Sequence, residues 1–211
     1  MPTPERTSLD AILTAGREIL EAEGLGGLTM QAVADRVGVR APSLYKRVRN
    51  RGELVRSIAA ATVAELGDRL EAPGEPSEPR APGEYGGPGA SREPGALGGP
   101  DAALARLARL AGIMRAFAHE RPAAYRLLFA SGDESGLEVE QLREASAPLL
   151  AVAAELAGPE HALDAARTLT AWVTGFISME LAGAFRLGGD VDRAFEYGVA
   201  HLGAALASSA R

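Results

Sequence analysis

The sequence predicts an all-α protein, and two observations, composition and apolar spacing, lead to this expectation. Alanine, leucine and glycine dominate the 211 residues, and aromatic residues make up only 5%. Runs of β-branched residues, which favour strands, are scarce, whereas alanine and leucine are strong helix formers. Apolar residues recur at intervals of three and four, which is the spacing of one helix face. A chain of this length can bury a substantial core, as one large or two small domains.

The first expected helix runs from Ser8 to about Glu23, with Ser8 or Thr7 as its N-cap. Three glycines that follow Glu23 are expected to end it. Its apolar positions have helical spacing and are Leu9, Ile12, Leu13, Gly16, Ile19 and Leu20.

The segment TMQAVADRVGVRAPSLYKRV, residues 29–48, predicts two short helices around a tight turn. Thr29 can cap the first helix, and Gly38 can end it in the left-handed conformation. Pro42 suits the first turn of the second helix, where a missing N–H does no harm. Leu44 gives that second helix a buried side. This pattern is typical of a helix-turn-helix motif, which places its second helix in the DNA major groove.

Positive charge is concentrated around this motif. The stretch from Arg36 to Arg56 carries a net charge of +6, whereas the whole chain carries −6. Only Glu53 opposes the cations of this stretch. These cations are Arg36, Arg40, Lys46, Arg47, Arg49, Arg51 and Arg56. One basic surface on an acidic body can neutralise phosphates at that surface alone, so the predicted partner is double-stranded DNA.

A further helix is expected from Asn50 to about Glu71, because Asn50 and Glu53 form a signal like a capping box. The next 28 residues, 73–100, contain seven prolines and eight glycines. More than half of these positions disfavour the interior of a helix or strand, which predicts a flexible insert. The expected domains are a DNA-binding domain at 1–50 that extends into the connecting helix 51–71, the insert at 73–100, and a helical domain at 101–211.

Helical spacing resumes after Asp101. It predicts helices at 101–120, 122–129, 137–156 and 159–187, and then a last helix that Asp190 caps. Pro148 is expected to kink or split the third of these. The last two helices form an antiparallel hairpin with excess apolar surface, so two copies would pack as a four-helix bundle. The residues expected at this homodimer interface are Ile177, Leu181, Phe185, Phe195, Val199, Leu202 and Leu206.

Residues from about Leu9 to Leu66 resemble the TetR family of bacterial transcriptional regulators. The resemblance lies in the exit of the first helix, GLGGLTMQAVADRVGV, and in Ser43-Leu44-Tyr45 with the basic stretch that follows. The segment APSLYKRVRNRGEL looks especially close to the recognition helix of the family's founding tetracycline repressor. The resemblance implies three DNA-binding helices on an all-α ligand-binding and dimerisation domain.

The sequence also departs from the family pattern. Arg40 stands where Ser or Thr usually caps the recognition helix, Arg47 where His or Tyr is usual, and Val48 where Phe is commoner. The two arginines change the chemistry that faces the groove, and with it the operator sequence. The C-terminal half resembles a subgroup named for a Trp-His-Gly motif. Trp172 matches that motif, but Thr174 stands where the subgroup often has His.

The resemblance implies a regulator, expected to be a repressor, that binds a palindromic operator as a homodimer. It also implies release by a small-molecule effector, which we expect to be mostly apolar. The residues implied at the DNA are Thr29, Arg40, Ala41, Pro42, Ser43, Tyr45, Lys46, Arg47 and Arg51. The residues expected at the effector are Phe117, Leu127, Phe129, Leu149, Trp172, Thr174, Phe176 and Met179.

Several other classes of protein are disfavoured. The absence of cysteine excludes disulfides and thiolate metal sites. His119, His161 and His201 lack the spacing of metal ligands, and no phosphate loop or nucleophile motif occurs. We therefore expect no metal, no cofactor and no enzymatic activity. The N-terminus is polar and no apolar run of about 18 residues occurs, so we expect a cytoplasmic protein without a membrane span.

Two other interpretations stay open. The chain could be an effector-independent DNA-binding regulator or activator, and nothing in the sequence excludes this. It could instead be a small-molecule binding protein whose DNA-binding end is vestigial. The intact basic helix argues against the second interpretation.

Overall fold

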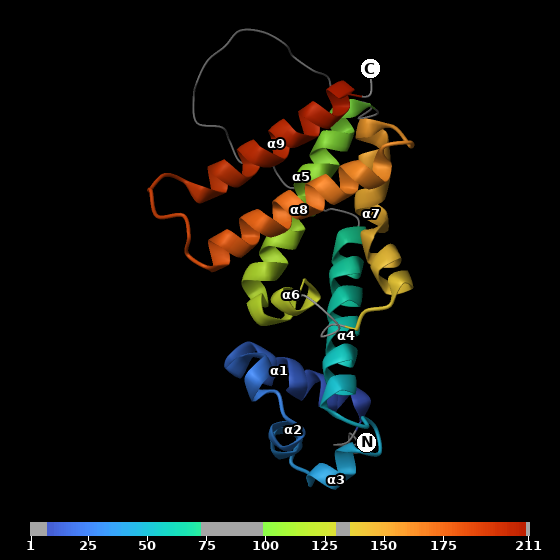
Figure 1. Ribbon diagram of the computed structural model, residues 1–211, viewed down its shortest axis with the longest axis vertical. Coiled ribbons are helices and arrows are strands. Elements are labelled where there is room, and N and C mark those ends of the chain that lie inside the picture. The colour runs from blue at the N-terminus through green and yellow to red at the C-terminus, as the bar shows by residue number, and fades with distance from the viewer. Residues whose placement is uncertain (1–7, 73–98, 130–135, 210–211) are drawn as a thin grey trace.

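The computed structural model describes residues 8–72, 99–129 and 136–209, and in these ranges all regular secondary structure is helical (Figure 1). The fold class is therefore all-α, as predicted. The helices are α1 (Leu9–Gly27), α2 (Met30–Val37), α3 (Ala41–Leu44), α4 (Arg51–Glu71), α5 (Pro100–Glu120), α6 (Pro122–Leu128), α7 (Val139–Ala157), α8 (Ala162–Leu181) and α9 (Val191–Ser209). All but the last two residues of the expected insert lie outside the described residues. No helix of the described part is long and apolar enough to cross a membrane.

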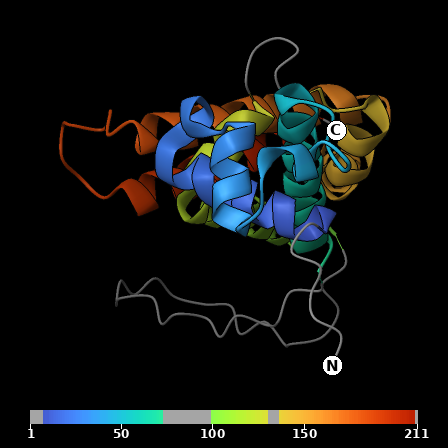
Figure 2. The same ribbon diagram turned by 90° about the horizontal axis from the view of Figure 1, so that it is seen from below.

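Helices α1 to α3 form a small domain at one end of the molecule, below α4 in Figure 1 and in front of the larger domain in Figure 2. The Ser8 hydroxyl caps α1 by accepting the Ala11 N–H at 3.1 Å, which confirms that cap. Regular helical geometry breaks at Gly24, where φ is 71°, close to the expected end. Ile12 and Ile19 are buried in the core of this domain.

Helix α4 belongs to two hydrophobic cores. Leu54 and Ile58, in its first half, are fully buried with the apolar residues of α1 and α2. Leu66 and Leu70, in its second half, belong to the core of the larger domain. Asn50 accepts the Glu53 N–H at 2.9 Å, so the predicted N-cap is confirmed. One continuous helix therefore connects the two domains.

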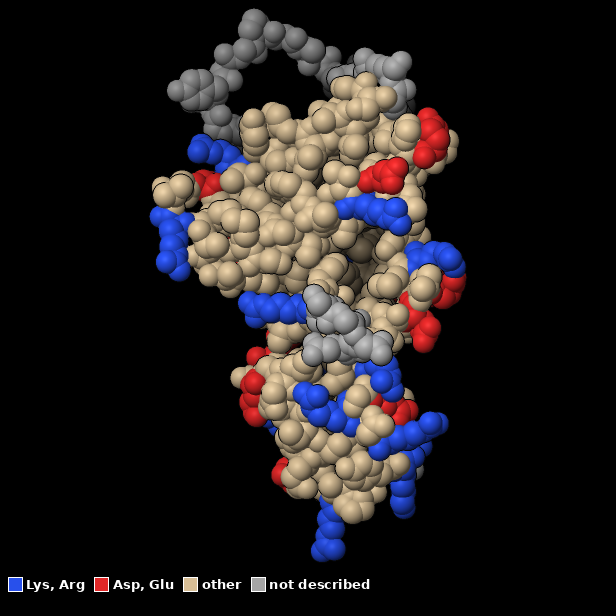
Figure 3. All heavy atoms as spheres, viewed as in Figure 1, with Lys and Arg blue, Asp and Glu red and all other residues tan. Residues whose placement is uncertain are grey.

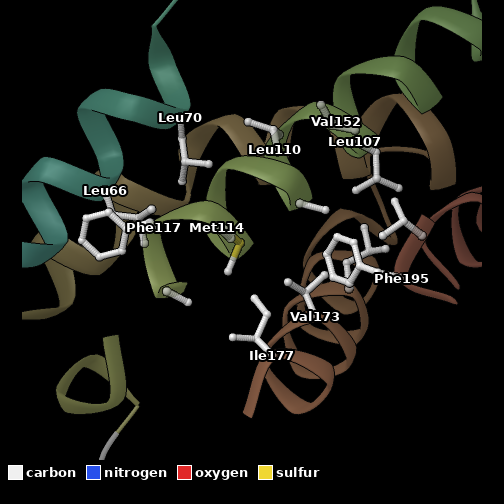
Figure 4. Close-up of a cluster of buried hydrophobic side chains, with 14 of the residues drawn as sticks. Leu66, Leu70, Leu107, Leu110, Met114, Phe117, Val152, Val173, Ile177 and Phe195 are labelled. Atoms are coloured by element: carbon white, nitrogen blue, oxygen red, sulfur yellow. The ribbon is translucent and has the colours of Figure 1, made fainter. Parts of the chain in front are cut away.

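The larger domain packs α4 to α9 around one main apolar cluster, and α5 runs through its middle. Figure 4 shows side chains from α4, α5, α7, α8 and α9 converging on this cluster. Phe117 of α5 is fully buried there, with Met114 one turn before it. The Arg69 guanidinium lies 4.9 Å from the centre of the Phe117 ring, so a cation from α4 packs on this core.

Two carboxylates connect the domains. Glu21 of α1 accepts the backbone N–H groups of Ala123 and Ala124, at 3.0 and 2.8 Å, at the start of α6. A carboxylate at that position satisfies free N–H groups and the positive end of the helix dipole. Through this contact the small domain holds α6, whose Ala124 is itself buried in the small domain's core.

The second carboxylate is Glu65, which lies in the second half of α4. Arg17 of α1 approaches it at 3.5 Å, Arg69 of α4 donates to it at 3.0 Å, and Arg121 donates at 2.8 Å. The Glu65 side chain is 24% exposed, so solvent screens these pairs only partly. Arginines from three parts of the chain therefore share one acceptor at the junction of the domains.

Two expected features of the larger domain differ in the structure. Pro148 does not split α7, which continues to Ala157, because Val152 and Leu156 anchor the second half in the core. Helix α8 ends at Leu181, six residues earlier than expected. Gly183 adopts a φ of 62° and its N–H bonds to the Glu180 carbonyl, a common helix ending. The apolar spacing continues beyond this point only on the exposed turn that leads to α9.

Helices α8 and α9 pack through an aromatic cluster. The Trp172 ring lies 5.4 Å from Phe176 and 5.8 Å from Phe195, between ring centres. The Trp172 ring fits against α9 because residue 198 is glycine. A Cβ at Gly198 would lie 2.1 Å from the ring. The predicted cap of α9 is confirmed, since Asp190 accepts the Arg193 N–H at 3.0 Å.

Gly198→Ala should lower the free energy of unfolding by about 1–3 kcal/mol, because the added methyl forces Trp172 off its site. Urea unfolding monitored by circular dichroism measures this change. Gly112→Ala is the matched control, because a Cβ at this exposed helical glycine meets nothing within 4 Å. The control should be neutral or stabilising by up to about 1 kcal/mol. Equal stabilities of the two variants would contradict the packing described here.

Candidate DNA-binding surface and inner pocket

Helices α2 and α3 form the expected helix-turn-helix. The Thr29 hydroxyl accepts the Ala32 N–H at 3.1 Å, which confirms the cap of α2. Gly38 has a φ of 73°, and the Val39 N–H bonds to the Ala34 carbonyl at 2.9 Å. This arrangement satisfies the last carbonyls of α2 and turns the chain sharply. The turn sets the direction of α3, and Leu44 anchors α3 because it is fully buried.

The predicted DNA-contacting residues between Arg40 and Arg47 lie on and beside α3, at the tip of the small domain (Figure 1). Figure 3 shows basic side chains projecting from this end of the molecule, where Figure 1 places α3. Tyr45 is 51% exposed although it is aromatic, which suits a residue that meets a partner. Arg40, Pro42, Tyr45, Lys46 and Arg47 are exposed, and Ala41 and Ser43 are half-buried. These residues are therefore accessible to a partner, and their contact with DNA stays a prediction.

Two of the basic residues are held by other parts of the small domain. Arg51 donates from Nε to the Leu28 carbonyl at 2.7 Å and from Nη2 to the Leu25 carbonyl at 2.5 Å. Its side chain thereby fixes the loop between α1 and α2. Its backbone N–H at the start of α4 is the group that suits a phosphate. Arg36 pairs with Glu18 at 2.8 Å, so part of its charge is neutralised within the domain.

The larger domain contains an inner pocket between α4, α5, α7 and α8. Its volume is about 110 Å³. The lining contains no charged side chain, and its polar groups are the hydroxyls of Ser146 and Thr170. The lining residues are Val63, Leu66, Leu70, Leu107, Leu110, Ala111, Met114, Leu128, Phe129, Leu137, Leu142, Ala145, Ser146, Leu149, Leu169, Thr170 and Val173. Such a lining suits an uncharged, mostly apolar molecule.

The residues expected at the effector do not share one cavity. Phe129 and Leu149 line the inner pocket. Phe117 is fully buried in the adjoining core, and Leu127 is buried in the core of the DNA-binding domain. Met179 is 49% exposed on the surface of α8.

Three other expected residues, all on α8, also lie outside the lining. Trp172 and Phe176 belong to the aromatic cluster with α9. Thr174 lies beside Tyr125 of α6, and within the described residues neither hydroxyl has a well-formed hydrogen bond. Burial raises the pKa of the Tyr125 hydroxyl, so it stays protonated at neutral pH.

Most of the pocket wall was not expected from the sequence. Val63, Leu66 and Leu70 of α4 and Met114 of α5 line the pocket, and none of them is among the residues expected at the effector. Their spacing identifies a buried face, but it cannot separate a cavity wall from a filled core. That distinction depends on how closely the neighbouring helices approach.

The residues expected at the dimer interface also lie in different places, some in the core of the protomer and some at its surface. Ile177, Phe195 and Val199 are at most 5% exposed and fill the core of the protomer itself, so their side chains do not reach a partner. The apolar stripe that suggested them faces α5. Phe185 is 37% exposed and lies on the turn between α8 and α9. Leu181, Leu202 and Leu206 are half-buried against the same core.

The fold and the exposed basic helix-turn-helix define a DNA-binding transcriptional regulator. Residues 12–58 match the family described as bacterial regulatory proteins, tetR family. Residues 107–202 match the family of the tetracyclin repressor-like C-terminal domain. The chain belongs to the TetR family of transcriptional regulators, which are not enzymes.

Curated relatives and solved structures are similar to this chain. An uncharacterized HTH-type transcriptional regulator of Mycobacterium tuberculosis, Rv0681, is 26% identical over 85% of this chain and 73% of its own length. The tetracycline repressor class E of Escherichia coli is 36% identical over 28% of each chain. The crystal structure of TetR-Q116A from Acinetobacter baumannii, in complex with minocycline, superposes with a TM-score of 0.64 at 21% identity, over 97% of this chain and 98% of its own. A Rhodococcus protein of unknown function reaches 0.71 at 21% identity, over 98% and 100%.

Lys46→Ala and Arg47→Ala should each weaken operator binding several-fold without unfolding the protein, because both side chains are exposed. Each loss of a phosphate contact should also reduce the slope of log affinity against log salt by about one unit. Tyr45→Phe should give a milder loss. Fluorescence anisotropy over a salt series, with an operator selected from a random DNA library, measures both quantities.

Arg143→Ala on α7 is the matched control, because it removes one exposed positive charge far from α3. Its affinity and salt slope should equal those of the parent. If Lys46→Ala and Arg47→Ala also match the parent, α3 does not contact DNA.

Proposed function

We propose that the protein is a dimeric repressor that binds a palindromic operator and is released by an uncharged, mostly apolar small molecule. The observation that carries this proposal is the course of α4. Helix α4 begins a short loop after α3, at Arg51, and Val63, Leu66 and Leu70 further along it line the inner pocket. A movement of the pocket wall is therefore a movement of the helix that positions α3.

The size of the inner pocket supports a mechanism in which the ligand displaces this wall. Ligand sites of drug-sized molecules usually measure about 300–1,000 Å³. The pocket is smaller, at about 110 Å³, so a ligand must push its walls apart. A ligand acts on DNA binding only by favouring one arrangement of α4 over the other. A coupling of about 1–3 kcal/mol would weaken operator binding by about 5- to 150-fold.

The outward faces of α8 and α9 support the dimer. Ala171 and Gly175 on α8, and Ala194 and Ala204 on α9, are exposed and small. Small side chains allow two helices to approach closely, which suits a four-helix bundle made by two copies. A two-fold dimer would present two copies of α3, as two half-sites about 34 Å apart require.

The small size of the pocket also favours a second candidate function. A regulator that needs no effector would have a filled core where the inner pocket lies. A cavity of about 110 Å³ is close to a filled core. In that case DNA binding would depend on protein concentration alone. The exposed basic surface on α3 argues against a vestigial DNA-binding end.

The effector proposal is tested with N-phenyl-1-naphthylamine, an uncharged apolar dye that becomes fluorescent in apolar surroundings. The dye should bind the full chain and release the selected operator in a gel shift. Leu149→Trp should abolish both responses, because the larger side chain fills the pocket. Val139→Trp, at the exposed start of the same helix, should leave both intact. Dye binding that never changes operator affinity would favour the effector-independent regulator.

The dimer is tested with a charge on its expected face. Gly175→Glu and Ala204→Glu should shift the mass measured by light scattering toward the monomer, because like charges would meet across the two-fold axis. Ala151→Glu, on an exposed position of α7, should leave the mass at that of a dimer. A monomeric parent at micromolar concentration would contradict the dimer. A dimer that survives both substitutions would place the interface elsewhere.

A further inference from the structure

A second cavity, which we call the charged groove, lies between α5 and α9 beside the end of α8. Its volume is about 870 Å³. None of its lining residues belongs to the inner pocket. Its size lies within the range of sites for drug-sized ligands. The groove is therefore a separate site of sufficient size for a small organic molecule.

The floor of the groove is apolar and its rim is charged. Gly112 of α5 and Phe195 and Val199 of α9 contribute to the floor. The charges come from Arg115, Glu180, Asp192 and Glu196, with His119 beside them. Three carboxylates therefore face one guanidinium. These four groups together carry a net charge of −2, which favours a cation.

The guanidinium of Arg115 is already counted in this net charge, and it is bound to two of the three carboxylates. It donates to both carboxylate oxygens of Glu180, at 2.8 and 2.5 Å, and to Asp192 at 2.6 Å. The Glu180 hydrogen bonds and charge hold the pKa of Arg115 above its ordinary value, and Arg115 holds the pKa of Glu180 below its own. Both groups stay ionised at neutral pH. Asp192 has a 77% exposed side chain, so it can also face a second cation.

The position of Arg115 shows what kind of group the groove accommodates. The guanidinium carbon lies 5.0 Å from the centre of the Phe195 ring, so a planar cation already sits over an aromatic face between carboxylates. Glu196 follows Phe195 on α9. Its side chain has no hydrogen bond or ion pair within the described ranges. A ligand cation near Glu196 would find a carboxylate without a partner and an apolar floor for its body.

The proposed dimer would leave this groove open. Asp192, Glu196 and Ala200 are spaced by four along α9 and share one face of the helix. Tyr197, His201 and the small residues of the expected dimer face lie on a different side of α9. A partner packed on that side would not cover the groove.

We propose that the charged groove binds an organic monocation with an apolar body, at a site independent of the inner pocket. The apolar body would lie on the accessible apolar lining of Leu104, Ala108 and Ala200. The positive charge would lie among Asp192, Glu196 and Glu180. Binding of the cation does not require that the protein release DNA. The proposal can therefore be tested separately from the proposed effector mechanism.

Tetraphenylphosphonium and tetraphenylborate are the test probes, because they match in shape and differ in the sign of their charge. Isothermal titration calorimetry with the full chain should show binding of the phosphonium and at least about tenfold weaker binding of the borate. Glu196→Gln should weaken phosphonium binding about fivefold. Gly112→Leu should abolish it by filling the groove, since a Cβ at Gly112 meets no atom within 4 Å.

Three controls assign the site. Glu140→Gln removes an exposed carboxylate from α7 and should leave phosphonium affinity unchanged. Leu149→Trp fills the inner pocket and should also leave it unchanged. The mass of Gly112→Leu by light scattering should equal that of the parent.

Several results would overturn the proposal. These are the absence of phosphonium binding, equal binding of both probes, or phosphonium binding that Leu149→Trp abolishes and Gly112→Leu preserves. A changed oligomeric mass of Gly112→Leu would also overturn it, because the groove would then be a protein interface.

Discussion

Helix α4 is one rigid element whose two halves are buried in different cores, and the arrangement of the whole molecule depends on this sharing. At about 1.5 Å per residue its 21 residues span about 30 Å. Leu54 is fixed by the small domain and Leu70 by the large one. Neither core can shift along α4 without exposing apolar surface, which costs about 25 cal/mol per Å². The lower-cost motion is a tilt of α4 as a unit, and such a tilt changes the direction of α3.

The carboxylates at the domain junction limit that tilt. Glu65 accepts arginines from α1, α4 and the start of α6, so a tilt changes several charge-assisted contacts together. Glu21 holds α6 to α1 through two backbone N–H groups. Helix α6 is therefore anchored to the DNA-binding domain while its last residue, Leu128, lines the inner pocket. The pocket is connected to α3 by two routes, one through α4 and one through α6.

Local signals in the sequence predicted much of this fold. The features that were predicted wrongly depend on tertiary packing. Thr29 and Asn50 were identified as caps because capping depends on a few neighbouring residues. The predicted end of α8 was wrong because the apolar spacing continues through an exposed turn. Phe195 was expected at a dimer interface because spacing shows that a face is buried without showing what buries it. Lys46 is exposed just after α3, and its contact with DNA stays a prediction.

The two cavities of the larger domain differ in the free energy that a ligand must supply. The inner pocket is apolar and small, so a ligand gains hydrophobic burial there but must deform packed helices. The groove between α5 and α9 is already open, and Arg115 binds two of its carboxylates, Glu180 and Asp192. A ligand in that groove gains electrostatic attraction with little rearrangement, and salt would weaken its binding. A molecule suited to one cavity is therefore poorly suited to the other. A charge entering the inner pocket would find no counter-ion, and a neutral molecule in the groove would leave Glu196 unpaired.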